Sequence, residues 1–154
     1  ARQLRDVALC VAGPVARLPP ELTIESTRRT AASLGADVFA VLASKGHVPL
    51  PDSLQGWLTG YTFFEDGAGP GSLRAEYARV NPGNRSGDLI AAYAEVGGNF
   101  LGPLVGNDGR NAFMLRDLWR CWQLICSYEE QYQVVYRYFG FSRLDTHWLT
   151  PPPP

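Results

Sequence analysis

Residues 7–12 read VALCVA, a continuous apolar run that ends at Gly13. A short apolar run bounded by turn residues is typical of a strand buried on both faces, as in a parallel sheet. Residues 21–34 follow with apolar side chains at helical spacing. Residues 36–43, ADVFAVLA, form a second apolar and partly β-branched run. The order strand, helix, strand predicts a parallel pair joined by a right-handed crossover.

The other strong elements lie near the end of the chain. Residues 111–133 carry apolar side chains at i, i+3, i+4 and i+7 spacing, which predicts a long amphipathic helix. Residues 132–141 are aromatic and β-branched and predict a third strand. Residues 44–110 contain many prolines and glycines, so we expect a loop-rich region there, with short elements such as a strand near 73–80 and a helix near 89–96. The pattern as a whole predicts an α/β fold with a mostly parallel sheet.

The composition indicates a globular chain with a sizeable core. The 154 residues are 45% hydrophobic and 12% aromatic, which fits a single domain over residues 1–154. Lys and Arg number 14 against 15 Asp and Glu, for a formal net charge of −1. This balance argues against a protein that binds nucleic acid or a membrane surface, because either would show a basic excess. No apolar stretch is long enough to span a bilayer, so we expect no membrane contact within this segment.

The turn after the first strand is a candidate binding site for a nucleotide. At the carboxyl end of a parallel strand, Gly13 lets backbone N–H groups approach a phosphate, and Arg17 would bind the same anion. The alternative is a structural glycine and a solvated arginine in a surface loop. Asn111, at the start of the long helix, is a further nucleotide-binding candidate because a helix N-terminus offers free N–H groups. It is equally a good helix cap.

A charged cluster of Arg143, Asp145 and His147 comes where the third predicted strand must end. Asp145 and His147 are spaced i, i+2, which on an extended segment directs both side chains to the same side, where they would bind a divalent cation. Arg143 would pair with the acid or contact an anion. The alternative is an Arg–Asp ion pair at a strand end with an exposed histidine.

Three cysteines, Cys10, Cys121 and Cys126, form no metal-binding motif and leave an odd thiol. Cys10 lies in a predicted buried strand, where free cysteine is common. Cys121 and Cys126 are on different faces of the long helix, which argues against a disulfide between them. The disulfide status of all three stays open. Asn84 begins an Asn-Arg-Ser sequon, which matters only if the chain passes through the secretory lumen.

These residues carry a resemblance to a known family. Residues 8–13 with Arg17 resemble the first strand of a family of eukaryotic and viral glycosyltransferase-like proteins, and residues 36–39 resemble its second strand. Residues 119–129 and 136–148 are similar to the family's long helix, strand and R-x-D element. In type-A glycosyltransferases that element stands where the D-x-D motif lies. The resemblance covers the two ends of the chain and leaves about residues 44–110 unmatched.

The resemblance implies a Rossmann-like three-layer α/β/α fold of the type-A glycosyltransferase kind. The first strand's end would receive the nucleotide, with Gly13, Arg17, Asn111 and Arg143 as its contacts, and Asp145 with His147 would bind the metal on the diphosphate. The protein would transfer a sugar from a nucleotide-diphosphate donor to an unknown glycan or protein acceptor, with the metal acting as a Lewis acid on the departing diphosphate. His147 stands where a second carboxylate is usual, which favours Mn²⁺ over Mg²⁺. The expected location is the secretory pathway lumen (Golgi) or the extracellular space.

A second function stays open beside the first. The chain begins at Ala1 without Met and ends seven residues after His147, whereas acceptor recognition and any catalytic base lie downstream of this motif in the resembled family. We therefore expect a nucleotide-binding fragment of a longer chain, truncated after the metal-motif strand. The alternative is a non-catalytic binding or assembly module within a larger protein. An unrelated hydrolase or reductase is disfavoured, since neither G-x-S-x-G nor G-x-G-x-x-G occurs.

Overall fold

The computed structural model describes residues 2–18, 20–46, 48–65 and 110–149. The chain divides into two compact units, Ala1–Asp66 with Leu118–Pro154 and Gly67–Asp117. Of the second unit, residues 110–117 are described, and they form the first turns of a long helix. The predicted strand near 73–80, the predicted helix near 89–96 and the sequon at Asn84 lie outside the described residues.

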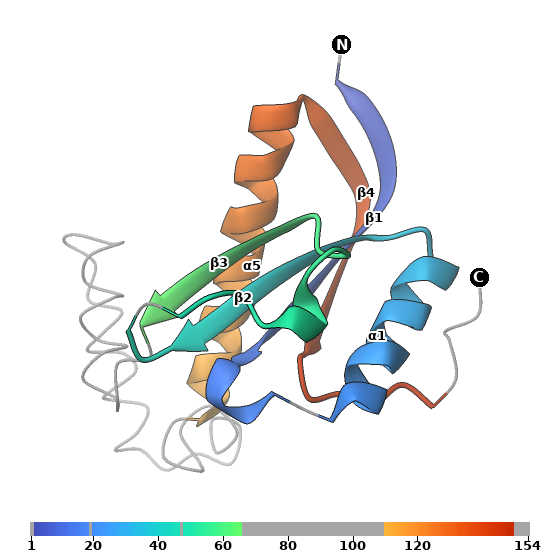
Figure 1. Cartoon of the computed structure of the whole chain (residues 1–154). Helices are drawn as coiled ribbons and strands as arrows, with labels where there is room; N and C mark the ends of the chain where they lie inside the picture. The colour runs from blue at the N-terminus through green and yellow to red at the C-terminus, as the bar shows by residue number, and fades with distance from the viewer. Residues whose placement is uncertain (1, 19, 47, 66–109, 150–154) are drawn as a thin grey trace, which may run out of the picture. The chain divides into compact units, whose positions relative to one another are not determined.

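Four parallel strands form the sheet of the first unit, in the order β3-β2-β1-β4 (Figure 1). Their bounds are Gln3–Pro14 for β1, Asp37–Ser44 for β2, Gly60–Glu65 for β3 and Val134–Arg143 for β4. The predicted α/β fold with a mostly parallel sheet is confirmed, and every strand pair among the described residues is parallel.

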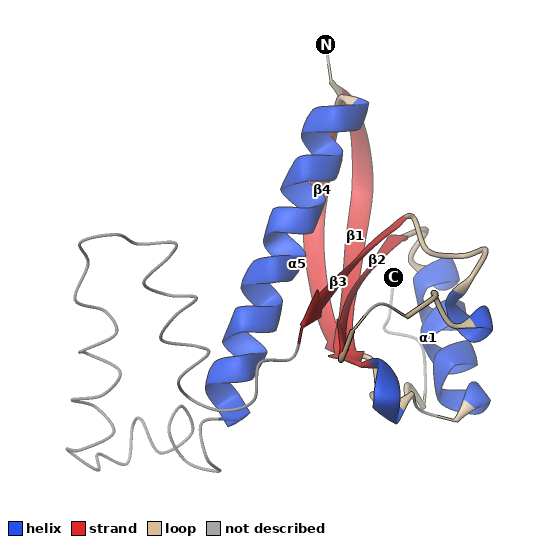
Figure 2. Cartoon of the chain, turned by 60° about the vertical axis from the view of Figure 1, so that its left-hand side comes forward, coloured by secondary structure: helices blue, strands red, loops and turns tan. Residues whose placement is uncertain are grey.

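Helices cover both faces of this sheet. A short 3-10 helix, η1 (Val15–Arg17), follows β1 and leads into α1 (Glu21–Ser33). A second one, η2 (Asp52–Leu54), precedes β3, and α5 (Arg110–Tyr132) precedes β4. Figure 2 shows α1 and α5 on opposite sides of the strands. The three-layer α/β/α arrangement of a Rossmann-like fold is therefore present. The two predicted helices that fall within the described residues agree with the structure to within one residue at each end.

The alternation of side chains along the central strands explains why two helices are needed. Cys10 and Phe39 lie on the face that packs against Ile125 of α5, whereas Val11 of β1 lies on the face that packs against Ile24 of α1. Successive side chains of a strand point to opposite faces, so a strand covered on both sides reads as an unbroken apolar run. This is why residues 7–12 are recognisable from their sequence alone as a strand buried on both faces.

Strand β3 lies in the region for which the sequence predicts mainly loops. Its six residues, GYTFFE, include no fully buried side chain, and its amino end pairs with β2 through Gly60 and Phe39. A Cβ at Gly60 would lie 3.2 Å from the Phe39 ring, so this close pairing favours glycine. The strand depends on hydrogen bonds to β2, and a six-residue pattern between glycines carries little local signal.

Candidate functional site

The carboxyl ends of β1 and β4 lie side by side at one edge of the sheet. Ala12 pairs with Arg143, and the N–H of Leu144 donates to the Ala12 carbonyl at 2.8 Å. From β1 the chain passes to β2 and β3 on one side, and it returns to place β4 on the other. Such a reversal of strand order is the switch point at which open α/β sheets bind ligands. The structure thus brings the turn at Gly13 and the cluster at Arg143 to the same edge.

Gly13 is in contact with the segment that follows β4. A Cβ at this position would lie 2.9 Å from the Leu144 Cβ, closer than real Cβ atoms approach another carbon. The Leu144 side chain is buried and packs in the core on the α1 side of the sheet. The missing side chain of Gly13 is therefore explained by the close approach of the two strand ends, with no need of a ligand.

Two more of the predicted nucleotide contacts, Arg17 and Asn111, are placed only by their backbones. Arg17 is the last residue of η1, directly after β1 and so near the edge at which the first strand ends. Asn111 is the second residue of α5, because the helix begins at Arg110. It therefore lies inside the first turn and not at the capping position that the sequence suggested. The side chains of Arg17 and Asn111 lie outside the described part of the structure.

Arg143 and Asp145 form a two-pronged ion pair. The Arg143 Nε donates to Asp145 Oδ1 at 2.8 Å, and Nη2 donates to Oδ2. The two side chains are 66% and 52% exposed. The hydrogen bonds from Arg143, reinforced by its charge, hold the pKa of the Asp145 carboxyl below its ordinary value. Asp145 is thus a carboxylate at neutral pH, the form that a cation binds.

His147 lies against α1. Strand β4 ends at Arg143, and residues 144–145 form a turn, so the extended geometry assumed for Asp145 and His147 is wrong. The Nδ1 atom of His147 lies 3.4 Å from the hydroxyl oxygen of Thr23 on α1. Among the described residues, no three His, Cys, Asp or Glu side chains gather in a group that would bind a metal ion.

The donor set at this edge suits one kind of cation site. A divalent cation at a phosphate commonly takes one or two carboxylates from the protein and its other ligands from phosphate and water. Asp145 is exposed, charged and located at the switch-point edge, so it fits the role of that carboxylate. His147 would add a ligand only through Nε2 or after leaving Thr23.

A disulfide joins the sheet to the long helix. Cys10 of β1 and Cys121 of α5 are bonded, with their Cα atoms 5.9 Å apart, and both residues are fully buried. Cys126 is free and half-buried, and burial raises the pKa of its thiol. This pairing was not predicted from the sequence, which left the disulfide status of the three cysteines open. The available signal was that Cys10 lies in a buried strand and Cys121 on the helix that would pack against it.

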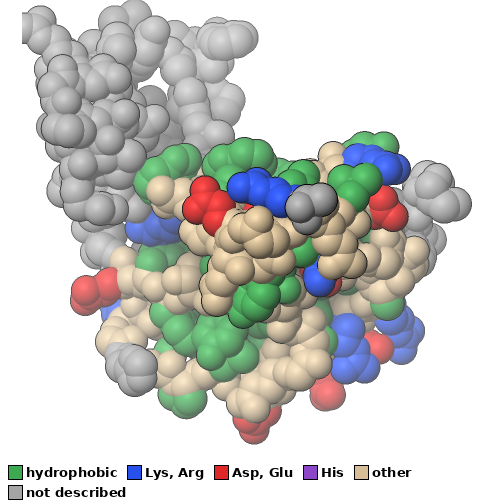
Figure 3. Space-filling view, turned by 90° about the horizontal axis from the view of Figure 1, so that it is seen from above, with side chains coloured by type: hydrophobic (Ala, Val, Ile, Leu, Met, Phe, Trp, Pro, Cys, Tyr) green, Lys and Arg blue, Asp and Glu red, His purple; other side chains and the backbone are tan. Residues whose placement is uncertain are grey.

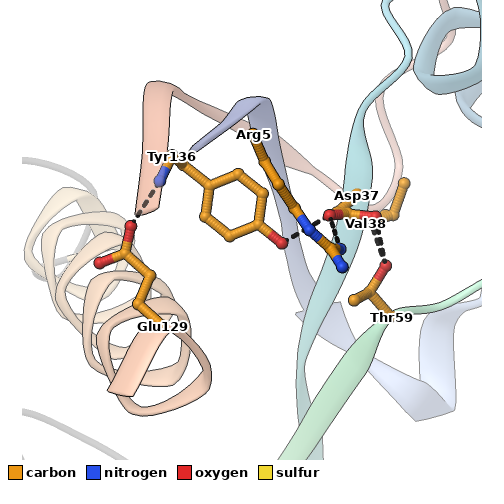
Figure 4. Close-up of polar contacts among 6 residues, drawn as sticks. All are labelled: Arg5, Asp37, Val38, Thr59, Glu129 and Tyr136. Atoms are coloured by element: carbon orange, nitrogen blue, oxygen red, sulfur yellow. Dashed lines mark hydrogen bonds and ion pairs between the residues drawn. The ribbon is translucent and has the colours of Figure 1, made fainter. Parts of the chain in front are cut away.

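A polar network lies near the amino ends of the strands (Figure 4). The Asp37 carboxylate accepts hydrogen bonds from Arg5 Nη1 and, at 2.6 Å, from the Tyr136 hydroxyl. The hydroxyl of Thr59 lies 3.5 Å from the other oxygen of Asp37 and accepts the Val38 N–H. The network joins β1, β2 and β4 with the residue that precedes β3. We assign it to stability, because it lies at the end of the sheet opposite to the switch-point edge.

The surface carries charges of both signs. On the face seen in Figure 3, Lys and Arg side chains lie near Asp and Glu side chains, with hydrophobic groups between them. Arg28 and Arg29 of α1 illustrate this pattern, since both pair with Glu25 at 3.0 Å. None of the described helices has the length and apolar character that crossing a bilayer requires.

Comparison of the chain with protein-family models, with curated proteins and with solved structures finds no match of any of the three kinds.

Proposed function

We propose that this chain binds a nucleotide-diphosphate sugar at the carboxyl ends of β1 and β4 and transfers the sugar to a glycan or protein acceptor. One observation carries the proposal: the strand order β3-β2-β1-β4 brings the turn at Gly13 beside Arg143 and Asp145. A single diphosphate would span both segments, whereas segments at opposite edges would have argued against it. The R-x-D resemblance supplies the reaction class.

The residues at this edge have distinct roles in the proposed site. The backbone after Gly13 and the guanidinium of Arg17 would receive the phosphates, and Arg143 would add a two-pronged contact. Asp145, with His147 as a further donor, would hold a divalent cation, for which Mn²⁺ remains the expected ion. That cation, when bound, supplies Lewis-acid neutralisation of charge on the leaving diphosphate.

A non-catalytic binding module is the second candidate. The observation that favours it is the Arg143–Asp145 pair, in which the arginine satisfies the cluster's single carboxylate without a metal ion. In that case the edge would bind a phosphate-bearing ligand through arginine alone. Binding that is independent of the cation separates this candidate from the first.

The disulfide supports the proposed location in the secretory pathway. A buried disulfide between Cys10 and Cys121 forms and persists in an oxidising compartment, and such bonds are rare in the cytosol. The sequon at Asn84 agrees with the same location.

The test is calorimetric titration of the purified chain with UDP and with GDP, each with and without Mn²⁺. We expect one nucleotide to bind only with the cation and the Asp145→Asn variant to lose this cation-dependent binding. Asp6→Asn is the matched control, because Asp6 is an exposed carboxylate near the other end of the sheet. Cation-independent binding would favour the non-catalytic module, and no binding of either nucleotide would contradict the proposal.

A further inference from the structure

Arg143 engages both oxygens of the single carboxylate in the Arg143–Asp145–His147 cluster. Its Nε and Nη2 atoms donate to different oxygens of Asp145, which is the two-pronged geometry of strong arginine–carboxylate pairs. Arg143 is the last residue of β4, and Asp145 lies two positions later in the turn that follows the strand. A metal ion that binds Asp145 must therefore share an oxygen with a guanidinium N–H, and its charge would repel that of Arg143.

We propose that Arg143 is a latch for the phosphate site. It competes with the divalent cation for Asp145 while no ligand is bound, and it turns to the diphosphate after the cation has taken the carboxylate. This inference rests on the proposed function and adds a coupling to it: the cation and the nucleotide would each favour the binding of the other.

The surroundings of Arg143 allow it to change partners. Its side chain is 66% exposed, so the guanidinium can rotate without leaving a packed core. A cation at Asp145 would repel the guanidinium, and the planar fork of arginine matches a phosphate as well as a carboxylate. Arg143 pairs in the sheet with Ala12, the residue before Gly13. A diphosphate at that turn would therefore lie within reach of the freed side chain.

If Arg143 exchanges partners in this way, its replacement changes the binding affinities in a pattern that a purely structural role does not produce. Arg143 weakens the binding of the cation when the cation binds alone, and it strengthens the binding of the nucleotide when the cation is present. Replacing it should then move the two affinities in opposite directions, because the side chain repels one ligand and contacts the other. A residue that merely holds the end of β4 would move both affinities in the same direction or neither.

The experiment compares wild type, Arg143→Ala and Arg143→Lys. Binding of Mn²⁺ alone is measured from the loss of the free-ion signal in electron paramagnetic resonance. We expect Arg143→Ala to bind Mn²⁺ about two- to fivefold more tightly, the range that one exposed ion pair accounts for. With saturating Mn²⁺, calorimetry should show UDP or GDP binding to this variant at least about tenfold more weakly, since a charge-assisted contact is lost.

Two controls isolate the latch from general electrostatics and from folding. Arg137→Ala removes the same charge from the same strand, where Arg137 Nη1 lies 3.7 Å from Asp6 Oδ1. It should leave both affinities unchanged. Arg143→Lys keeps the charge and loses the fork, so its Mn²⁺ affinity should fall between those of wild type and Arg143→Ala. Circular dichroism checks that each variant keeps its fold.

The outcomes are distinguishable from those of the proposed function. If wild type binds the nucleotide with Mn²⁺ through Asp145 but Arg143→Ala leaves the affinity for Mn²⁺ alone unchanged or weaker, the latch is wrong and the proposed function stands. An equal increase in the affinity for Mn²⁺ in Arg137→Ala and Arg143→Ala would also overturn the latch. If no variant binds Mn²⁺ or either nucleotide, both ideas are wrong.

Discussion

At the scale of single residues, Gly13 shows how a close contact limits the choice of amino acid. A Cβ at Gly13 would lie 2.9 Å from the Leu144 Cβ. Leu144 directly follows β4, and its N–H is hydrogen-bonded to the Ala12 carbonyl of β1, so the two segments cannot easily separate. We expect Gly13→Ala to lower the free energy of unfolding by about 1–3 kcal/mol through overpacking. Urea denaturation followed by circular dichroism measures this change.

A second glycine provides the control for this prediction. At Gly140 a Cβ would lie 3.2 Å from Cδ1 of Leu9, which is the movable end of a side chain. Gly140→Ala should therefore cost less, below about 1 kcal/mol. The double variant Gly13→Ala/Leu144→Gly, which removes the Leu144 Cβ, should lose less stability than the sum of its two single variants. Equal costs for the two glycines would contradict this account of Gly13.

At the scale of elements, the network around Asp37 connects three strands of the sheet. Tyr136 of β4 donates to Asp37 of β2 at 2.6 Å, and Arg5 of β1 donates to the same carboxylate oxygen. Removal of the hydroxyl in Tyr136→Phe should lower the free energy of unfolding by about 1.5–3 kcal/mol, the usual contribution of a hydrogen bond to a charged group. Tyr138→Phe, at an exposed position of the same strand, should cost nothing measurable.

The same hydrogen bond predicts a dependence on pH. Burial, followed by the contact with Asp37, raises the pKa of Tyr136 above its ordinary value of 10.0. The folded state thus holds the phenol proton more tightly than the unfolded state. The difference in stability between wild type and Tyr136→Phe should be full below about pH 10 and should shrink as the pH rises further. Urea titrations of both proteins near pH 8 and near pH 11 test this trend; a constant difference would refute it.

At the scale of the whole molecule, the disulfide closes the longest covalent loop in the chain. Cys10 and Cys121 are 111 residues apart in sequence. A cross-link over such a distance restricts the unfolded chain, so reduction should lower the free energy of unfolding by about 2–5 kcal/mol. Urea denaturation with and without a reductant measures the loss, and Cys126→Ser should behave like wild type.

Peptide mapping under non-reducing conditions tests the pairing directly. The peptides that contain Cys10 and Cys121 should be recovered as one linked species from protein secreted by a eukaryotic host, with Cys126 as the alkylated thiol. Recovery of all three cysteines as alkylated peptides from unreduced protein would show that the bond does not form.

The site was predictable to the extent that local pattern reveals strand ends. Arg143 and Asp145 follow an apolar run, and Gly13 follows another, so both segments were expected at the carboxyl ends of parallel strands. Their adjacency required the order of the strands, which depends on contacts between residues more than a hundred positions apart. The geometry of His147 was not predictable, because the chain turns at residues 144–145 and leaves the extended path.

The amino-acid sequence by itself determined the layers of this protein. The runs at 7–12 and 36–43, and the apolar stripe of 111–133, are local patterns that match the repeat of a strand or a helix, and they hold whatever lies next to them. Only the tertiary structure decided that β3 forms, that Cys10 meets Cys121, that Leu144 occupies the space beside Gly13 and that His147 lies against Thr23 of α1. Each of these depends on which surfaces of distant elements come into contact, and a local repeat carries no information about its partner.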